Sequence, residues 1–280
     1  MIDQLRQTCR KLLEEGAVHV VIGYGQDKPS MMPHPVFITK PEECGRLVWN
    51  DLCFANLAAY ITRKEIKALG KLAVIVKGCD ERALVVLEQE SQFTRDGIYV
   101  IGMACNGMGN PRAAKCASCA VRTPRYADVT IGEAKPAAPS ADGAFAQLDE
   151  FMKKTPAERF AYWKSEFSRC VKCYACREVC PMCYCNRCLV DKNRPTAIDT
   201  SATLKGNLAW HIARAFHQAG RCVGCDECTR ACPAGINLRL LNQSLAKAAG
   251  CAFAYKAGMD KETPPVIGSY SLEDKENFIQ

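Results

Sequence analysis

The sequence predicts two domains of different class, an α/β domain with a small parallel sheet at residues 1–132 and a mostly α-helical domain at residues 147–250. Three observations support this division. Two apolar, strand-like runs lie in the first part, at residues 72–76 and 98–103. Residues 133–146 are rich in Pro and Ala and lack periodicity, so we interpret them as an interdomain linker. Beyond the linker, apolar residues recur at helical spacing and most of the cysteines are concentrated.

The elements of the first domain follow from apolar periodicity and from the residues that end each element. Ile2, Leu5 and Leu12 predict a helix at residues 2–15, which Gly16 ends. An amphipathic stretch between the two strand-like runs predicts a parallel pair joined by a right-handed crossover. The other expected elements are this crossover helix at residues 80–90, strands at 18–22 and 36–39, and helices at 41–49 and 54–69.

The second domain carries clear signals for the ends of its helices. Thr155-Pro156-Ala157-Glu158 combines an N-cap, a proline at the first helical position and a capping-box Glu, and predicts a helix that runs into Cys170. Two further helices are expected at Leu204–Ala219 and Leu238–Ala249, each followed by a glycine. Residues 251–280, interrupted by two prolines, lack a core pattern, and we expect a tail that docks a partner.

The most informative feature is a cysteine run that occurs twice. Cys170-Val-Lys-Cys173-Tyr-Ala-Cys176-Arg-Glu-Val-Cys180-Pro181 recurs 52 residues later as Cys222-Val-Gly-Cys225-Asp-Glu-Cys228-Thr-Arg-Ala-Cys232-Pro233. Each copy reads C-x2-C-x2-C-x3-C-P, the run that binds [4Fe–4S] clusters in two-cluster ferredoxins, where the fourth cysteine ligates the other cluster. C-x2-C pairs alone would also suit zinc, but the third cysteine and the proline favour clusters. We therefore predict a helical two-cluster ferredoxin domain, with one cluster on Cys170, Cys173, Cys176 and Cys232 and the other on Cys222, Cys225, Cys228 and Cys180.

A third site is predicted in the first domain. Cys79 and Cys105 each follow a strand of the parallel pair, and the carboxyl ends of parallel strands meet at one edge of a sheet. Cys116-Ala-Ser-Cys119 follows in a loop. Four cysteines that converge on one edge predict a four-thiolate site. Spacing alone leaves three alternatives open, namely a third [4Fe–4S] cluster, a zinc ion on Cys116 and Cys119, and simple burial of the thiols.

Seven cysteines lie outside these three sets. Cys183-Tyr-Cys185-Asn-Arg-Cys188 suggests an additional metal, either a fourth cluster or zinc, with free thiols as the alternative. Cys9 and Cys53 lie on apolar helix faces and are expected in the core. Two histidines of the 204–219 helix, His211 and His217, point to different faces and are expected in the core or on the surface, not as ligands.

Composition excludes several classes of protein. The 19 cysteines are odd in number and bunched at metal-ligand spacings, and no signal segment opens the chain, so we expect a reducing cytoplasm and not a disulfide scaffold. No apolar run is long enough for a membrane span. The formal charge of +7 is largely offset if each oxidised cluster with its thiolates carries about −2, and no basic block is present, so we expect no nucleic-acid partner.

Three segments of the first domain resemble the β-subunit family of deazaflavin-reducing hydrogenases and formate dehydrogenases. They are Lys77-Gly-Cys79-Asp-Glu-Arg-Ala83, Ile101-Gly-Met-Ala-Cys105, and Cys116-Ala-Ser-Cys119 with Pro124-Arg-Tyr-Ala-Asp128-Val-Thr-Ile-Gly132. The second half resembles the ferredoxin-type subunits of heterodisulfide-reductase-like flavoproteins. The first resemblance implies a [4Fe–4S] cluster on Cys79, Cys105, Cys116 and Cys119.

Together these resemblances imply an electron-transfer subunit of a hetero-oligomeric, anaerobic oxidoreductase, with three clusters and no catalytic residues of its own. Its partners would be redox subunits such as a flavoprotein, a hydrogenase or a formate dehydrogenase. The first domain is shorter than the flavin-binding region of that family, and Gly23-Tyr-Gly25 is not followed by a helix as a dinucleotide fingerprint requires. A flavoenzyme that binds FAD and reduces a deazaflavin or a nicotinamide at the first domain stays as the alternative.

Overall fold

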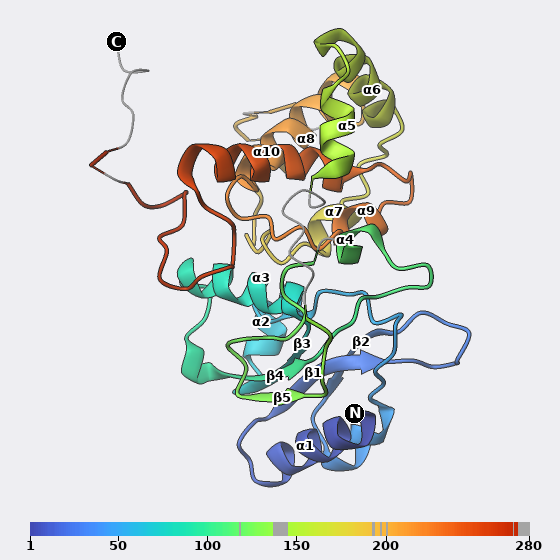
Figure 1. Cartoon of the computed structure of the whole chain (residues 1–280), viewed down its shortest axis with the longest axis vertical. Helices are drawn as coiled ribbons and strands as arrows, with labels where there is room; N and C mark the ends of the chain where they lie inside the picture. The colour runs from blue at the N-terminus through green and yellow to red at the C-terminus, as the bar shows by residue number, and fades with distance from the viewer. Residues whose placement is uncertain are drawn as a thin grey trace.

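The computed structural model describes the whole chain except residues 118, 137–144, 192–193, 197, 200, 271 and 274–280. An α/β domain occupies the lower half of the molecule in Figure 1 and a helical domain the upper half. The last strand of the sheet ends at Ile131 and the next helix begins at Ala146. The expected linker therefore lies between the two domains, and part of it is outside the described residues.

The first domain is built on a five-stranded mixed sheet with the strand order β2-β1-β3-β4-β5. The strands are β1 (Val20–Gly25), β2 (His34–Ile38), β3 (Leu72–Val76), β4 (Ile98–Met103) and β5 (Val129–Ile131). Neighbouring strands from β1 to β5 are parallel, which confirms the predicted β3–β4 pair, whereas β2 is antiparallel to β1. The expectation of a wholly parallel sheet is therefore wrong at this edge, because the short connection from β1 to β2 can join only antiparallel neighbours.

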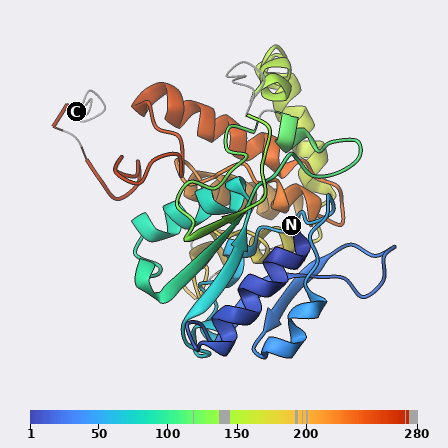
Figure 2. The same ribbon diagram turned by 60° about the horizontal axis from the view of Figure 1, so that its bottom comes forward.

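Helices cover both faces of the sheet. Helix α1 (Ile2–Glu14) buries Leu5, Cys9 and Leu12 and lies on the side away from the helical domain, whereas α3 (Gly78–Gln89) lies on the side towards it (Figures 1 and 2). The other elements are short: α2 (Lys64–Lys67), α4 (Ala114–Ala117) and the 3-10 helices η1 (Pro41–Arg46), η2 (Leu57–Tyr60) and η3 (Arg95–Gly97).

The long helices expected at residues 41–49 and 54–69 are wrong, because only η1, η2 and α2 form there. Two contacts hold the second of these segments out of a continuous helix. The Asn56 side chain accepts a hydrogen bond from the Ala58 N–H, and the carbonyl of Ala55 accepts one from Lys77. Such contacts with other parts of the chain cannot be inferred from the local pattern.

The second domain is helical. Its elements are α5 (Ala146–Met152), α6 (Pro156–Ser168), α7 (Ala175–Glu178), η4 (Leu189–Asp191), α8 (Leu204–His217), α9 (Glu227–Arg230) and α10 (Leu238–Phe253). Thr155 and Glu158 form the predicted capping box of α6, and Asn237 caps α10. Helix α10 runs past its predicted end at Gly250, and the left-handed residue that ends it is Ala254. Among the described residues, no helix is long and apolar enough to cross a lipid bilayer.

The first half of the expected tail packs against the chain's own first domain. Tyr255 and Ala257 are buried in the core of the α/β domain, and the guanidinium of Arg82 donates to the carbonyl of Ala257. The side chain of Gln89 donates to three carbonyls between residues 260 and 263. Figure 1 shows this red segment beside α3. The expectation that the tail lacks a core is therefore wrong at Tyr255 and Ala257, and a docking role for residues 251–280 stays a prediction.

Candidate metal centres

The eight cysteines of the repeated run divide between two cavities of the helical domain. One cavity is lined by Cys170, Cys173, Cys176 and Cys232, and the other by Cys180, Cys222, Cys225 and Cys228. In each cavity, three cysteines come from one copy of the run and the fourth comes from the other copy. We call these the first and second ferredoxin cavities. Their volumes are similar, about 380 and 390 Å³.

The two copies of the run share one backbone conformation. In the first copy Lys172 and Tyr174 have positive φ values of 56° and 60°, and in the second Gly224 and Asp226 have values of 71° and 66°. These are equivalent positions on either side of the second cysteine of each run. Left-handed backbone is strained for a residue other than glycine, so three of these four positions carry local strain of the kind that concentrates at functional sites. Helices α7 and α9 then follow at equivalent positions and pack against each other.

Most of the thiols in these cavities are buried or partly buried, whereas Cys173 is exposed, and burial makes a thiol a poor anion unless a positive centre lies nearby. Burial raises the pKa of Cys176 and of Cys225 to about 11. Backbone N–H groups point at some of the sulfurs, including those of Cys170 and Cys222, and lower their pKa against the effect of burial. An all-sulfur set of four thiols, some of which accept N–H···S bonds, fits a cluster of iron and sulfide.

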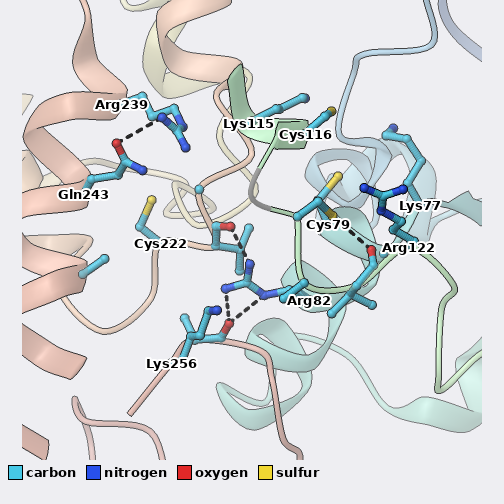
Figure 3. Close-up of a pocket in the computed structure, with 18 of the residues that line it drawn as sticks. Lys77, Cys79, Arg82, Lys115, Cys116, Arg122, Cys222, Arg239, Gln243 and Lys256 are labelled. Carbon is cyan, nitrogen blue, oxygen red and sulfur yellow. Dashed lines mark hydrogen bonds between the residues drawn. The ribbon is translucent and has the colours of Figure 1, made fainter. Parts of the chain in front are cut away.

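The four first-domain cysteines line a third cavity. Cys79, Cys105, Cys116 and Cys119 line it together with Cys222 of the helical domain. Figure 3 labels Cys79, Cys116 and Cys222. This first-domain cavity measures about 1150 Å³, about three times the volume of either ferredoxin cavity. The backbone N–H groups of Gly107 and Met108 donate to the sulfurs of Cys105 and Cys116, with N to Sγ distances of 3.4 Å. As predicted, the site lies beyond the carboxyl ends of β3 and β4.

The Lys77-Gly78-Cys79-Asp80 segment at the start of α3 shapes this site. Lys77 is 1% exposed, and its Nζ lies 2.7 Å from the Asp80 carboxylate and also contacts the Tyr24 hydroxyl. Burial alone would lower the pKa of Lys77, but the charge of Asp80 outweighs it and raises the pKa. A Cβ on Gly78 would lie only 1.9 Å from the carbonyl oxygen of Val121. Glycine at this position thus allows the loop that carries Cys119 to approach.

The lining of the first-domain cavity is basic. Six cationic residues and no acidic ones contribute to it: Lys77, Arg82, Lys115, Arg122, Arg239 and Lys256. In Figure 3, Arg82 lies between Cys79 and Cys222, and Arg239 lies on the opposite wall. Arg82 also donates to the carbonyl of Val223, so it joins the two domains at the cavity. A negatively charged group would be stabilised here.

His211 has a role that the sequence did not indicate. Its Nε2 lies 3.3 Å from the sulfur of Cys170, and its ring stacks on Phe167 with centroids 4.4 Å apart. Burial, assisted by the charge of Arg214, lowers the pKa of His211 to about 3, so the ring is neutral. A neutral ring protonated at Nε2 can donate an N–H···S bond to this thiolate. His211 was expected in the core or on the surface, and it is buried. Its contact with Cys170 was missed because helical periodicity carries no signal for it.

The remaining cysteines occupy unlike environments. Cys183 lies against Cys180, and its sulfur accepts a hydrogen bond from Gln218, whereas Cys185 is exposed and Cys188 lies near Asp191. Cys9 and Cys53 are fully buried, as predicted for core residues. No three His, Cys, Asp or Glu side chains among the described residues are placed to bind a single metal ion. An additional metal on Cys183, Cys185 and Cys188 stays a prediction.

The cysteine loops of the helical domain match a family of iron–sulfur domains. The family model described as "4Fe-4S dicluster domain" matches residues 166–236, which contain all eight cysteines of the repeated run. Over most of its length the chain is similar to the beta subunits of F420-dependent formate dehydrogenases, as the first-domain resemblance predicted.

Two such relatives are described here. The F420-dependent formate dehydrogenase subunit beta of Methanocaldococcus jannaschii is 23% identical, over 83% of this chain and 85% of the relative. The F420-dependent formate dehydrogenase 1 subunit beta of Methanococcus maripaludis is 22% identical, over 92% of this chain and 90% of the relative. The resemblance of the second half to heterodisulfide-reductase ferredoxin subunits stays a prediction.

Proposed function

We propose that this chain is the iron–sulfur electron-transfer subunit of a multi-subunit formate dehydrogenase, with one [4Fe–4S] cluster in each of the three cysteine cavities. The residues that hold them would be the three sets of four cysteines described above. A [4Fe–4S] cluster accepts and releases one electron at a time, so three of them would form a path between redox subunits. The similarity to beta subunits of formate dehydrogenases supports a partner that oxidises formate.

The observation that carries this proposal is the continuity of the three cavities. Cys222, Val223, Gly224 and Arg239 line both the first-domain cavity and the second ferredoxin cavity. The two ferredoxin cavities are joined in turn by Cys180 and Cys232, because each belongs to one run and lines the cavity of the other. The order is therefore first-domain cavity, second ferredoxin cavity, first ferredoxin cavity. Cys173 and Val171 of the last cavity are exposed, so electrons can leave or enter there.

Metal analysis of anaerobically purified chain tests the proposal. Three clusters of four irons predict about 12 iron atoms per chain. The clusters should be reduced and reoxidised by small dyes, while the isolated chain turns over no metabolite. Eight or fewer irons per chain, with zinc bound to the first-domain cysteines, would contradict the three-cluster path.

A second candidate function is favoured by the size and charge of the first-domain cavity. Its volume exceeds that of the ferredoxin cavities, and its cationic lining suits the phosphates of a flavin nucleotide or the acidic tail of a deazaflavin. The chain would then reduce the deazaflavin or a nicotinamide itself. Flavin absorbance in purified chain, with turnover of a deazaflavin or nicotinamide by the chain alone, would support this candidate over the first.

Substituting His211 by phenylalanine is expected to lower the reduction potential of the cluster in the first ferredoxin cavity. Phenylalanine keeps a ring beside Phe167 but cannot donate to the sulfur of Cys170, and loss of an N–H···S bond disfavours the reduced, more negative cluster. For a one-electron couple, a fall of about 59 mV is a tenfold change in the redox equilibrium. We expect a shift of up to about this size, measured by redox titration monitored by electron paramagnetic resonance.

The matched control for this prediction is His217→Phe, on the exposed part of the same helix. It should leave all three potentials unchanged. Equal potentials in the His211→Phe variant and the unaltered chain would show that this histidine only fills space.

A further inference from the structure

Lys115 lies where the first-domain cavity meets the second ferredoxin cavity. It directly precedes Cys116 and lines the first-domain cavity, as Figure 3 shows. Its Nζ donates a hydrogen bond to the carbonyl oxygen of Cys225 at a distance of 2.8 Å, and Cys225 lines the second ferredoxin cavity. The side chain is only 6% exposed. This cation is therefore enclosed between two sets of cysteines that belong to different domains.

The carboxylate of Glu227 does not fully neutralise Lys115. Its Oε1 lies 3.7 Å from the Lys115 Nζ, whereas its Oε2 lies 2.6 Å from the guanidinium of Arg230. Glu227 is thus shared, and the closer partner is Arg230. A net positive charge remains at the junction.

Arg214 occupies the corresponding place between the two ferredoxin cavities. It is 4% exposed, and its Nη2 donates a hydrogen bond to the carbonyl oxygen of Cys176 at a distance of 3.0 Å. Cys176 lines the first ferredoxin cavity. Its guanidinium also contacts the sulfur of Cys183, which lies against Cys180 of the second ferredoxin cavity. Within the described part of the chain, the Nε of Arg214 has no hydrogen-bond partner.

We propose that Lys115 and Arg214 are positioning residues that raise the reduction potentials of the clusters on both sides of each junction. The inference rests on the proposed electron-transfer function. A four-thiolate [4Fe–4S] centre carries about two negative charges when oxidised and gains a third on reduction. A buried positive charge nearby stabilises the reduced form more than the oxidised form, and low dielectric strengthens the effect. Each cation also offsets the repulsion between neighbouring clusters, so that both can hold an electron.

The positions of the two cations predict a selective pattern. Loss of the Lys115 charge should affect the first-domain cluster and the second ferredoxin cluster, but not the first ferredoxin cluster. Loss of the Arg214 charge should affect the two ferredoxin clusters, but not the first-domain cluster. The second ferredoxin cluster, which lies at both junctions, should respond to both substitutions. A general disturbance of the fold would not produce this pattern.

Redox titration of the full chain, monitored by electron paramagnetic resonance, tests the pattern. Lys115→Gln keeps a hydrogen-bond donor for the Cys225 carbonyl and removes the charge, whereas Lys115→Arg keeps both. We expect Lys115→Gln to decrease the reduced-to-oxidised ratio of the two adjacent clusters about tenfold at a fixed potential, a fall of about 59 mV. Lys115→Arg and the exposed control Lys71→Gln should match the unaltered chain. Arg214→Gln should shift the two ferredoxin clusters.

Three intact clusters with unchanged potentials in Lys115→Gln, or an equal shift of all three, would overturn the inference. If Lys115→Gln loses iron, the Glu227→Gln variant is measured instead. Removing this negative charge should raise the reduction potential of the second ferredoxin cluster. A fall or no change in that potential would count against the role of Lys115. Fewer than three clusters in the unaltered chain would instead contradict the proposed function, so the two failures are distinguishable.

Discussion

Substituting Gly78 by alanine is expected to remove the first-domain cluster, about four of twelve iron atoms per chain, and to leave both ferredoxin clusters in place. The new Cβ would lie 1.9 Å from the Val121 carbonyl oxygen and 2.8 Å from its Cγ1, so this loop must move. The same carbonyl oxygen lies 3.3 Å from the sulfur of Cys119, and a displaced Val121 takes this ligand with it. Overpacking of this kind typically costs about 1–3 kcal/mol. Iron analysis and spectra of the variant measure the loss.

Gly45→Ala is the matched control for this substitution. Nothing lies within 4 Å of a Cβ at Gly45, so the variant should bind as much iron as the unaltered chain. Full iron content in Gly78→Ala would mean that the approach of Val121 to α3 does not position Cys119. Loss of the ferredoxin clusters in the same variant would point to general unfolding instead.

Substituting Cys180 by alanine is expected to remove the cluster of the second ferredoxin cavity, although Cys180 belongs to the first cysteine run. The reason is the crossed arrangement, in which Cys180 lines the same cavity as Cys222, Cys225 and Cys228. The cluster next to Cys176 should be affected much less. Separate spectra of the two clusters, together with a loss of about four irons, measure the effect.

Cys183 makes this experiment more demanding, because it lies against Cys180 and could replace it as a ligand. The substitution is therefore also made together with Cys183→Ala. Cys183→Ala alone serves as the control and should keep the second ferredoxin cluster, because Cys183 does not line this cavity. Loss confined to the cluster of Cys170, Cys173 and Cys176 would refute crossed ligation.

Sequence reasoning succeeded where a local pattern determines an element and failed where distant contacts do. Strands β3 and β4 and the start of α6 match their predicted residues, because apolar runs, an N-cap and a proline act within a few residues. The segment at residues 54–69 has a helical pattern in isolation. In the structure, Lys77 donates a hydrogen bond to the Ala55 carbonyl, and a continuous helix does not form. The strand β2 was expected but its antiparallel direction was not, although the short connection from β1 permits no other pairing.

The candidate sites divide in the same way. The repeated spacing grouped the eight cysteines of the two runs, and the order of the strands grouped the four first-domain cysteines, into the sets that line the three cavities. The surrounding residues follow no such interval. Lys115, Arg214 and His211 reach the cysteines of other segments through folding, so nothing in their immediate sequence distinguishes them from surface charges or a core ring.

The segment that follows α10 also determines the order in which the protein can be completed. Tyr255, Lys256 and Ala257 form part of the wall of the first-domain cavity, although four of its cysteines were synthesised more than a hundred residues earlier. On a ribosome, the α/β domain therefore emerges with this cavity open on one side. Its wall closes only when nearly the whole chain has been made, so the first site to be synthesised is the last to be enclosed. The thiols of Cys79 and its neighbours are therefore accessible from outside for the longest part of synthesis.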